Sequence, residues 1–178
     1  MKKTVFLPLL TIVLAAALLF GLSFGLKAVA ETNAQAEHQR LLQTLLPGSE
    51  NFLVEPYAGE DVNIRSVHKG ETGFVIETAT NGYAGEIVML VGVHNDGYVT
   101  GLVIRRMEET PGLGGKALTD WQLLSQFLKT QGDAEVGTNV DAVTGATVTS
   151  KAIARCVNSA VGYVTGADAD SGATSWGG

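Results

Sequence analysis

Residues 85–106 read GEIVMLVGVHNDGYVTGLVIRR. Two runs rich in aliphatic and β-branched residues, 85–94 and 98–106, are separated by Asn95-Asp96-Gly97. An Asp-Gly pair between two such runs is typical of a β-hairpin, because these residues accept the positive φ angles that the turn requires. The stretch therefore predicts two antiparallel strands joined by a tight turn.

A third strand-like run lies just before this hairpin, at residues 73–79, and the three runs together predict an antiparallel meander. Two helices are expected after it. Thr119 or Asp120 caps the first, and the second runs from about Thr144 to Tyr163. The apolar residues on one side of the first helix are Trp121, Leu123, Leu124, Phe127 and Leu128. A small antiparallel sheet packed with helices indicates an α+β fold.

The N-terminal residues contain a long apolar run. Val5–Leu26 carries no charged residue, and as a helix it would span roughly 33 Å, about the thickness of a bilayer core. We expect one N-terminal transmembrane helix with its N-terminus inside, because Lys2 and Lys3 precede the run. The alternative is a signal peptide cleaved after residues 28–30 (AVA), although the run is longer than a signal-peptide core.

The remaining segments complete the expected domain organisation. Residues 31–46 have helical periodicity that Pro47-Gly48 ends, whereas residues 51–61 are expected to be irregular. The last residues are rich in Gly, Ala, Asp and Ser, which is typical of a flexible tail. The sequence thus predicts an anchor over 1–30, a helical stalk over 31–48, a globular domain over 49–165 and a tail over 166–178.

Charge and cysteine content exclude several classes of function. All 18 acidic residues follow Ala30, together with nine of the 12 lysines and arginines. An acidic domain without a basic patch has no electrostatic reason to bind nucleic acid. Cys156 is the single cysteine, so one chain can form no disulfide framework, CxxC pair or iron–sulfur ligand set. Because Cys156 falls on the apolar face of the last helix, we expect it to be buried packing.

Residues 141–150 read DAVTGATVTS and open the last helix. Thr144 can cap that helix, Gly145 lets the backbone turn tightly, and Ala146 removes bulk. The first amides of the helix then face outward without partners, which favours a phosphate. The hydroxyl of Thr147 can hold such a phosphate by a hydrogen bond or an ester. The alternative is an ordinary Thr cap before an amphipathic helix, which is the commoner arrangement.

The spacing Asp141-x-x-Thr144-Gly145-Ala146-Thr147 resembles the flavinylation motif of the FMN-binding domain family. Further stretches are similar to that family in the same order, namely Gly82-Tyr83-x-Gly85, residues 91–93, Asp96-Gly97 and residues 109–114 (ETPGLG). The resemblance covers essentially the whole chain. In length and layout it is similar to the G subunits of Rnf electron-transport complexes, whereas the longer C subunits of sodium-pumping NADH:quinone oxidoreductases fit less well.

This resemblance implies an electron-carrying flavoprotein subunit of a membrane-bound, ion-translocating ferredoxin:NAD-type oxidoreductase complex. Its cofactor would be FMN, joined to Thr147 as a phosphoester by a flavin transferase, with Asp141, Thr144, Gly145 and Ala146 completing the cofactor-binding motif. Residues 49–165 would be the FMN-binding domain, outside the cytoplasmic membrane. Its partners would be the other membrane subunits, and it would not turn over a substrate alone.

The loop at residues 109–114 holds a proline and two glycines, which allow a close backbone approach. The family resemblance implies that Glu109, Thr110, Gly112 and Leu113 form a wall against the isoalloxazine ring, with Leu113 packing on it. The residues by themselves also fit a plain strand-to-helix connection without a ligand.

Other candidate side chains have simpler interpretations. Trp121 and Phe127 are expected in the core rather than stacked on a flavin. The three histidines, His38, His68 and His94, lie in unrelated settings and do not form a metal set. Three cations flank the 109–114 loop and can steer a flavin phosphate, although solvated surface charge is the commoner role: Arg105, Arg106 and Lys116.

A second copy of the motif lies at residues 168–174 (DADSGAT). We expect Thr147 to be the flavin site, because a long amphipathic helix follows it and fixes its geometry. Only four residues follow Thr174, too few for a stable helix. The opposing argument is that an exposed tail is readily reached by a modifying enzyme.

Two other classes of function remain open from the sequence. One is a stand-alone extracytoplasmic FMN-binding reductase that uses a soluble acceptor. The other is a flavin-bearing sensor or binding module without turnover. The apolar N-terminal run and the absence of a substrate-pocket motif favour the electron-carrying subunit.

Overall fold

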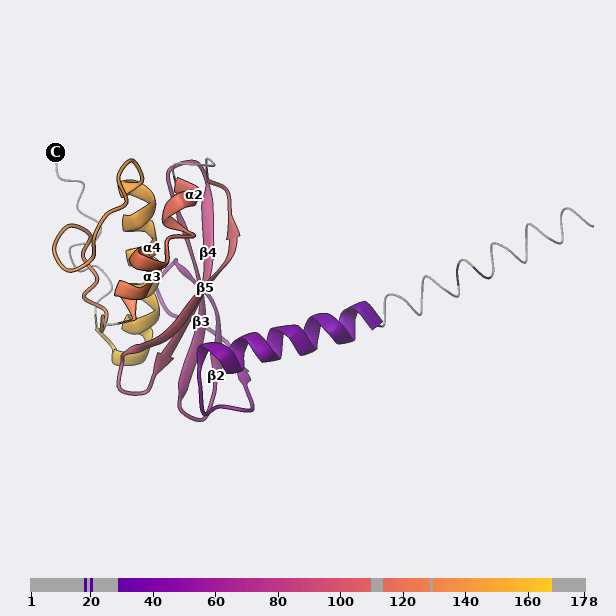
Figure 1. Cartoon of the computed structure of the whole chain (residues 1–178). Coiled ribbons are helices and arrows are strands. Elements are labelled where there is room, and N and C mark those ends of the chain that lie inside the picture. The colour runs from indigo at the N-terminus through magenta and orange to yellow at the C-terminus, as the bar shows by residue number, and fades with distance from the viewer. Residues whose placement is uncertain (1–17, 19, 21–28, 110–113, 129, 168–178) are drawn as a thin grey trace, which may run out of the picture. The chain divides into compact units, whose positions relative to one another are not determined.

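The computed structural model describes residues 18, 20, 29–109, 114–128 and 130–167 (Figure 1). Residues 29–45 are helical, and the chain divides into two units, 1–40 and 41–178. The second unit holds a five-stranded antiparallel sheet in the order β1-β2-β3-β4-β5. Its elements are β1 (Leu53–Glu55), β2 (Ile64–Lys69), β3 (Gly73–Asn81), β4 (Glu86–His94), β5 (Val99–Met107), α2 (Gly114–Ala117), α3 (Trp121–Phe127) and α4 (Thr147–Thr165). The predicted α+β class is confirmed.

The three predicted strands are confirmed as β3, β4 and β5. The turn between β4 and β5 closes as expected, because Gly97 has a φ of 84° and its N–H donates to the carbonyl of His94 at 2.8 Å. The expectation that residues 51–61 are irregular is wrong for Leu53–Glu55, which pairs with the end of β2. A three-residue strand is too short to show alternation, so only its pairing partner reveals it.

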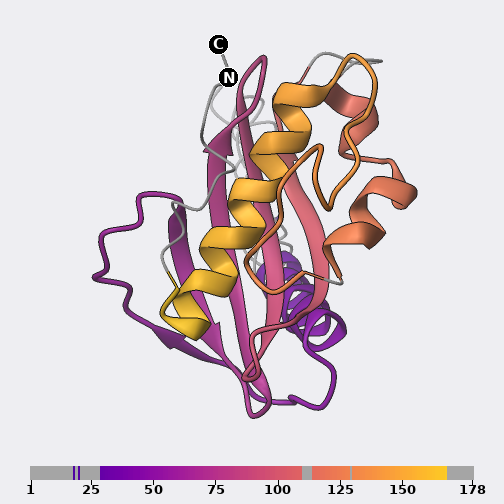
Figure 2. The same ribbon diagram turned by 90° about the vertical axis from the view of Figure 1, so that its left-hand side faces the viewer.

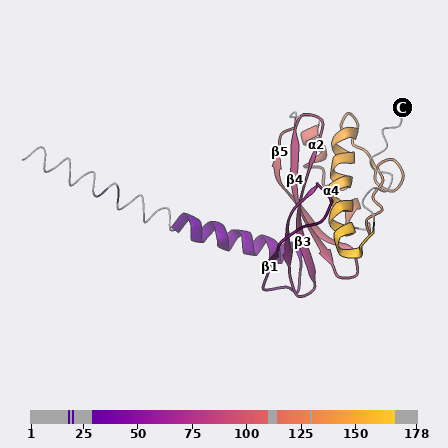
Figure 3. The same ribbon diagram turned by 180° about the vertical axis from the view of Figure 1, so that it is seen from behind.

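The sheet is buried on both faces. Successive strand residues point to opposite sides, so Ile76 and Val91 enter one core cluster while Val75 and Leu90 enter another. The first cluster is covered by α4, which crosses β3 and β4 diagonally (Figure 2) and runs along one side of the sheet (Figure 3). The second cluster is covered by Leu42, Leu45 and Leu46. Residues 42–46 therefore pack as part of the second unit.

A pair of facing glycines lets residue 45 approach the sheet closely. Gly92 of β4 and Gly101 of β5 are cross-strand partners, and a side chain on Gly92 would overlap the carbonyl oxygen of Leu45. The hydroxyl of Thr100 donates to that same oxygen. The two glycines and Thr100 therefore fix where residues 42–46 lie on the sheet.

The short helix α3 resolves the two expected caps in favour of Asp120. Its carboxylate accepts the N–H groups of Gln122 at 2.9 Å and Leu123 at 3.3 Å. The prediction that Phe127 is core is confirmed, but the same prediction for Trp121 is wrong, because 71% of that side chain is exposed. Leu123 and Phe127 are four residues apart and share a face, whereas Trp121 lies two residues from Leu123 and so on the other side.

Cys156 is fully buried on α4, as expected. Burial raises the pKa of its thiol to about 12, so the group stays protonated at neutral pH. A protonated, inaccessible thiol is neither a nucleophile nor a metal ligand. This cysteine therefore acts as a small apolar side chain.

Several predictions fall on other parts of the chain. The Val5–Leu26 run, apart from Leu18 and Phe20, and the segments 110–113 and 168–178 lie outside the described residues. Over the described ranges, no helix has the length and hydropathy needed to cross a membrane. Within these same ranges no three His, Cys, Asp or Glu side chains gather as a metal site.

Candidate functional site

The motif at residues 141–147 lies on the loop that leads into α4. Residues 143–146 form a β-turn, in which the N–H of Ala146 donates to the carbonyl of Val143 at 2.8 Å. Gly145 occupies the third position with a φ of 80°, a conformation that glycine adopts at little cost. The expected helix start and cap at Thr144 are wrong, because this turn delays the helix until Thr147 and leaves Ala146 at the cap position.

The start of α4 is uncapped and faces a cavity of about 380 Å³. The described residues lining it are Tyr83, Gly114, Gly145, Ala146, Thr147, Val148 and Thr149. The first amides of a helix have no partner within the helix and carry the positive end of its dipole, so they attract an anion. Thr147 is exposed at this cavity, which leaves its hydroxyl open to a reagent from solvent.

Two features of the cavity fit a bound phosphate. The hydroxyl of Thr149 is fully buried and has no hydrogen-bond partner within the described part of the chain. Leaving a buried hydroxyl unpaired costs about 1–3 kcal/mol, which a ligand oxygen at this point would offset. Gly114 keeps the space open, because a side chain there would begin 2.7 Å from the Thr149 hydroxyl. The residues present therefore fit a phosphate ester on Thr147.

Glu109 borders the same region but directs its carboxylate to the β3–β4 turn. One carboxylate oxygen accepts the N–H of Tyr83 at 2.6 Å and the other accepts the N–H of Ala84 at 3.3 Å. Side chains on Gly82 or Gly114 would overlap this carboxylate. The structure thus brings Glu109 to the site as a link between chain segments. The other predicted wall residues, Thr110, Gly112 and Leu113, lie outside the described residues.

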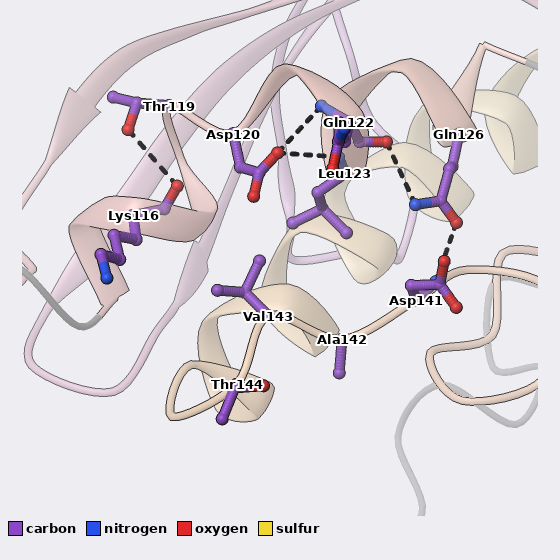
Figure 4. Close-up of a pocket in the computed structure, with 10 residues that line it drawn as sticks. All are labelled: Lys116, Thr119, Asp120, Gln122, Leu123, Gln126, Asp141, Ala142, Val143 and Thr144. Atoms are coloured by element: carbon purple, nitrogen blue, oxygen red, sulfur yellow. Dashed lines mark hydrogen bonds between the residues drawn. The ribbon is translucent and has the colours of Figure 1, made fainter.

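The first half of the motif lies at a second cavity, of about 570 Å³ (Figure 4). Its lining residues are Lys116, Thr119, Asp120, Gln122, Leu123, Gln126, Asp141, Ala142, Val143 and Thr144. Figure 4 shows the side chain of Gln126 reaching from α3 to Asp141, whose N–H donates to the Gln126 side-chain oxygen at 2.9 Å. The structure therefore divides the motif, with Asp141 and Thr144 against α3 and Gly145–Thr147 at the cavity beside Tyr83.

Two side chains beyond the motif hold its loop in shape. The hydroxyl of Ser150 donates to the carbonyl of Ala146 at 3.0 Å and accepts the N–H of Val143 at 3.4 Å. Gln126 fixes the other end, and its amide nitrogen donates to the carbonyl of Gln122 at 3.1 Å. Sequence reasoning did not assign either role. Ser150 was visible as a polar residue one turn into an apolar helix face, whereas nothing local marked Gln126.

Replacing Gln126 with leucine is expected to loosen the loop at Asp141. The exchange removes the acceptor of the Asp141 N–H, and such a hydrogen bond stabilises by about 1 kcal/mol. Hydrogen–deuterium exchange of a peptide over residues 138–144 should therefore become faster while the rest of α4 stays protected. Gln122→Leu is the matched control, since its side chain lines the same cavity without bonding the loop. Equal exchange in both variants would contradict the assignment.

The three expected phosphate-steering cations lie elsewhere. Arg105 and Arg106 border a third cavity, along β5, and Arg106 is ion-paired with Glu108. Lys116 lines the cavity at Asp141. None of the three belongs to the described lining of the cavity at Thr147. There the anion-attracting groups are backbone amides and a hydroxyl.

Comparison with known proteins gives consistent matches. Residues 82–162 match the FMN-binding domain family, a stretch that begins at the β3–β4 turn and ends within α4. It therefore contains every described residue that lines the cavity at Thr147.

Three similar relatives are G subunits of oxidoreductase complexes. The G subunit of the Na(+)-translocating ferredoxin:NAD(+) oxidoreductase complex of Acetobacterium woodii is 36% identical over 119 residues, covering 61% of this chain and 54% of that protein. The G subunit of the ion-translocating oxidoreductase complex of Methanosarcina acetivorans is 32% identical over 148 residues, covering 74% and 77%. The G subunit of the proton-translocating ferredoxin:NAD(+) oxidoreductase complex of Clostridium ljungdahlii is 39% identical over 99 residues, covering 52% and 53%. The chain thus spans about half the length of the first and third, and more of the second.

Proposed function

Because this chain belongs to the family of G subunits of ion-translocating oxidoreductase complexes and contains an FMN-binding domain, we propose that it carries electrons within such a complex through an FMN on Thr147. The observation that carries the proposal is the exposed Thr147 hydroxyl at the uncapped start of α4. The buried hydroxyl of Thr149 beside it supports a phosphate at the same point.

The attachment step needs an activated flavin donor. The Thr147 hydroxyl gives up its proton, its oxygen forms a bond to phosphorus, and the bond from that phosphorus to a leaving phosphate breaks. A flavin phosphoanhydride meets this requirement, whereas the phosphate of free FMN has no comparable leaving group. We propose that a flavin transferase supplies this donor and that Thr147 is the only acceptor.

The residues around Thr147 then hold and orient the product. The amides of Val148 and Thr149 and the Thr149 hydroxyl would donate to the phosphate, while Gly114 and Gly145 permit its close approach. The bound FMN supplies the electron-accepting and electron-donating chemistry. On the family resemblance we keep the remaining predicted cofactor residues in the proposal: Glu109, Thr110, Gly112, Leu113, Asp141, Thr144 and Ala146.

The location follows from the same proposal. The uncharged run Val5–Leu26 would anchor the protein in the cytoplasmic membrane as a single span, with the flavin domain on the extracytoplasmic side. There a covalent link keeps the cofactor from dissociating into a dilute exterior. The partners would be the other membrane subunits of the complex, as the names of the relatives indicate for those proteins.

Intact mass tests the proposal directly. The full chain, produced together with a flavin transferase, is expected to gain the mass of one FMN moiety, and peptide mapping should place it on the peptide that contains Thr147. An unmodified mass, or a flavin on the 168–174 peptide, would overturn the assignment.

A further inference from the structure

An exposed aromatic side chain borders the attachment cavity. Tyr83 lies at the tip of the β3–β4 hairpin, lines the cavity together with Thr147, and is 72% exposed. The hairpin tip and the start of α4 lie at the same end of the sheet (Figure 2). An aromatic ring gains about 0.5–1.5 kcal/mol from stacking on another ring, beyond the area that it buries.

The backbone under Tyr83 is fixed from below. Both oxygens of the Glu109 carboxylate accept amides of the turn, at Tyr83 and Ala84, across 26 and 25 residues of sequence. Gly82 closes the turn by donating its N–H to the carbonyl of Gly85 at 2.8 Å. Neither glycine has room for a side chain, because Glu109 fills the space beside Gly82 and Glu108 that beside Gly85.

We infer that Tyr83 contacts the isoalloxazine ring of the flavin and that Glu109 is a positioning residue, acting on the ring only through the turn that carries Tyr83. The inference rests on the proposed attachment at Thr147. It differs from a direct wall role for Glu109, since a carboxylate with both oxygens bound to amides has little left to offer a ligand. A tilt of the hairpin would move Tyr83 relative to the start of α4.

The fluorescence lifetime of the attached flavin is the readout, because a phenol in contact with an excited flavin donates an electron that returns as the ground state is restored. Phenylalanine keeps the shape of the ring but is not oxidised in this way. Tyr83→Phe is therefore expected to lengthen the lifetime several-fold. Tyr98→Phe is the matched control, since Tyr98 stacks on His94 at the far hairpin turn, and it should leave the lifetime unchanged.

Glu109→Gln tests the positioning role. The amide keeps one acceptor oxygen and places a donor against the second backbone N–H, so the turn loosens and the lifetime should shift toward that of Tyr83→Phe. In the Tyr83→Phe background the same exchange should add nothing. A further change there would show that Glu109 acts on the ring directly and would overturn the positioning role.

The lifetimes are compared only on full chains whose intact mass shows one flavin and whose flavin peptide contains Thr147. A chain without that mass refutes the proposed function and not the role of Tyr83. With the flavin in place, a Tyr83→Phe lifetime equal to that of the unaltered protein refutes the Tyr83 contact. An equal effect of Tyr98→Phe would also refute it, because the quenching would then not be local.

Discussion

Thr147→Ala is expected to abolish covalent flavin. The purified variant should have the mass of the unmodified polypeptide, and its denatured band should show no flavin fluorescence. The reason is chemical, because alanine has no oxygen to bond to phosphorus. The fold should be unaffected, since Thr147 is exposed, its side chain does not cap α4, and alanine is the best helix former.

Two further variants separate the hydroxyl from its setting. Thr147→Ser keeps an acceptor hydroxyl on the same turn and should retain flavin, whereas Thr174→Ala should leave one flavin on the Thr147 peptide. Thr149 offers no substitute acceptor, because its hydroxyl is fully buried. Flavin of undiminished intensity on Thr147→Ala would show that another residue, with Thr174 foremost, is the attachment point.

Gly92→Ala is expected to destabilise the domain by about 3 kcal/mol, at the upper end for overpacking, and to lower its melting temperature by roughly 10 °C. The new methyl group would overlap the carbonyl oxygen of Leu45, and that backbone cannot rotate away as a side chain can. It would also disturb the hydrogen bond from Thr100 to this oxygen. Thermal unfolding followed by circular dichroism measures the loss.

Gly101→Ala is the matched control on the neighbouring strand. Gly101 pairs with Gly92, but a side chain there would first meet the end of the Leu45 side chain, at 3.1 Å. That group can shift by a few tenths of an ångström, so a smaller loss of stability is expected. Equal losses in the two variants would mean that the backbone contact at Gly92 is not the cause.

These two results concern opposite sides of the sheet. The residues that pack over Gly92 belong to the core cluster of Leu42, Leu45 and Leu46, whereas Thr147 begins the helix that covers the other cluster. A Gly92→Ala protein that still folds at low temperature should therefore carry flavin normally. The attachment chemistry and the packing of residues 42–46 can be measured separately.

The amino-acid sequence by itself determined the features that depend on neighbouring residues. Alternating β-branched residues on either side of Asp96-Gly97 are sufficient for the β4–β5 hairpin, and Asp120 caps α3 through amides two and three residues away. The α+β class and the attachment motif at 141–147 follow from the same kind of local pattern. Such features need no knowledge of distant contacts, because all the interacting groups lie within a few residues.

The tertiary structure decided what depends on distant partners. It exposed Trp121, because the core lies on the other face of α3, and it paired Leu53–Glu55 with β2. It divided the motif between two cavities, through the contact of Asp141 with Gln126. It also turned Glu109 toward Tyr83, 26 residues away. Hydrogen bonds of this reach form only after the sheet has brought its loops together, so no local pattern specifies them.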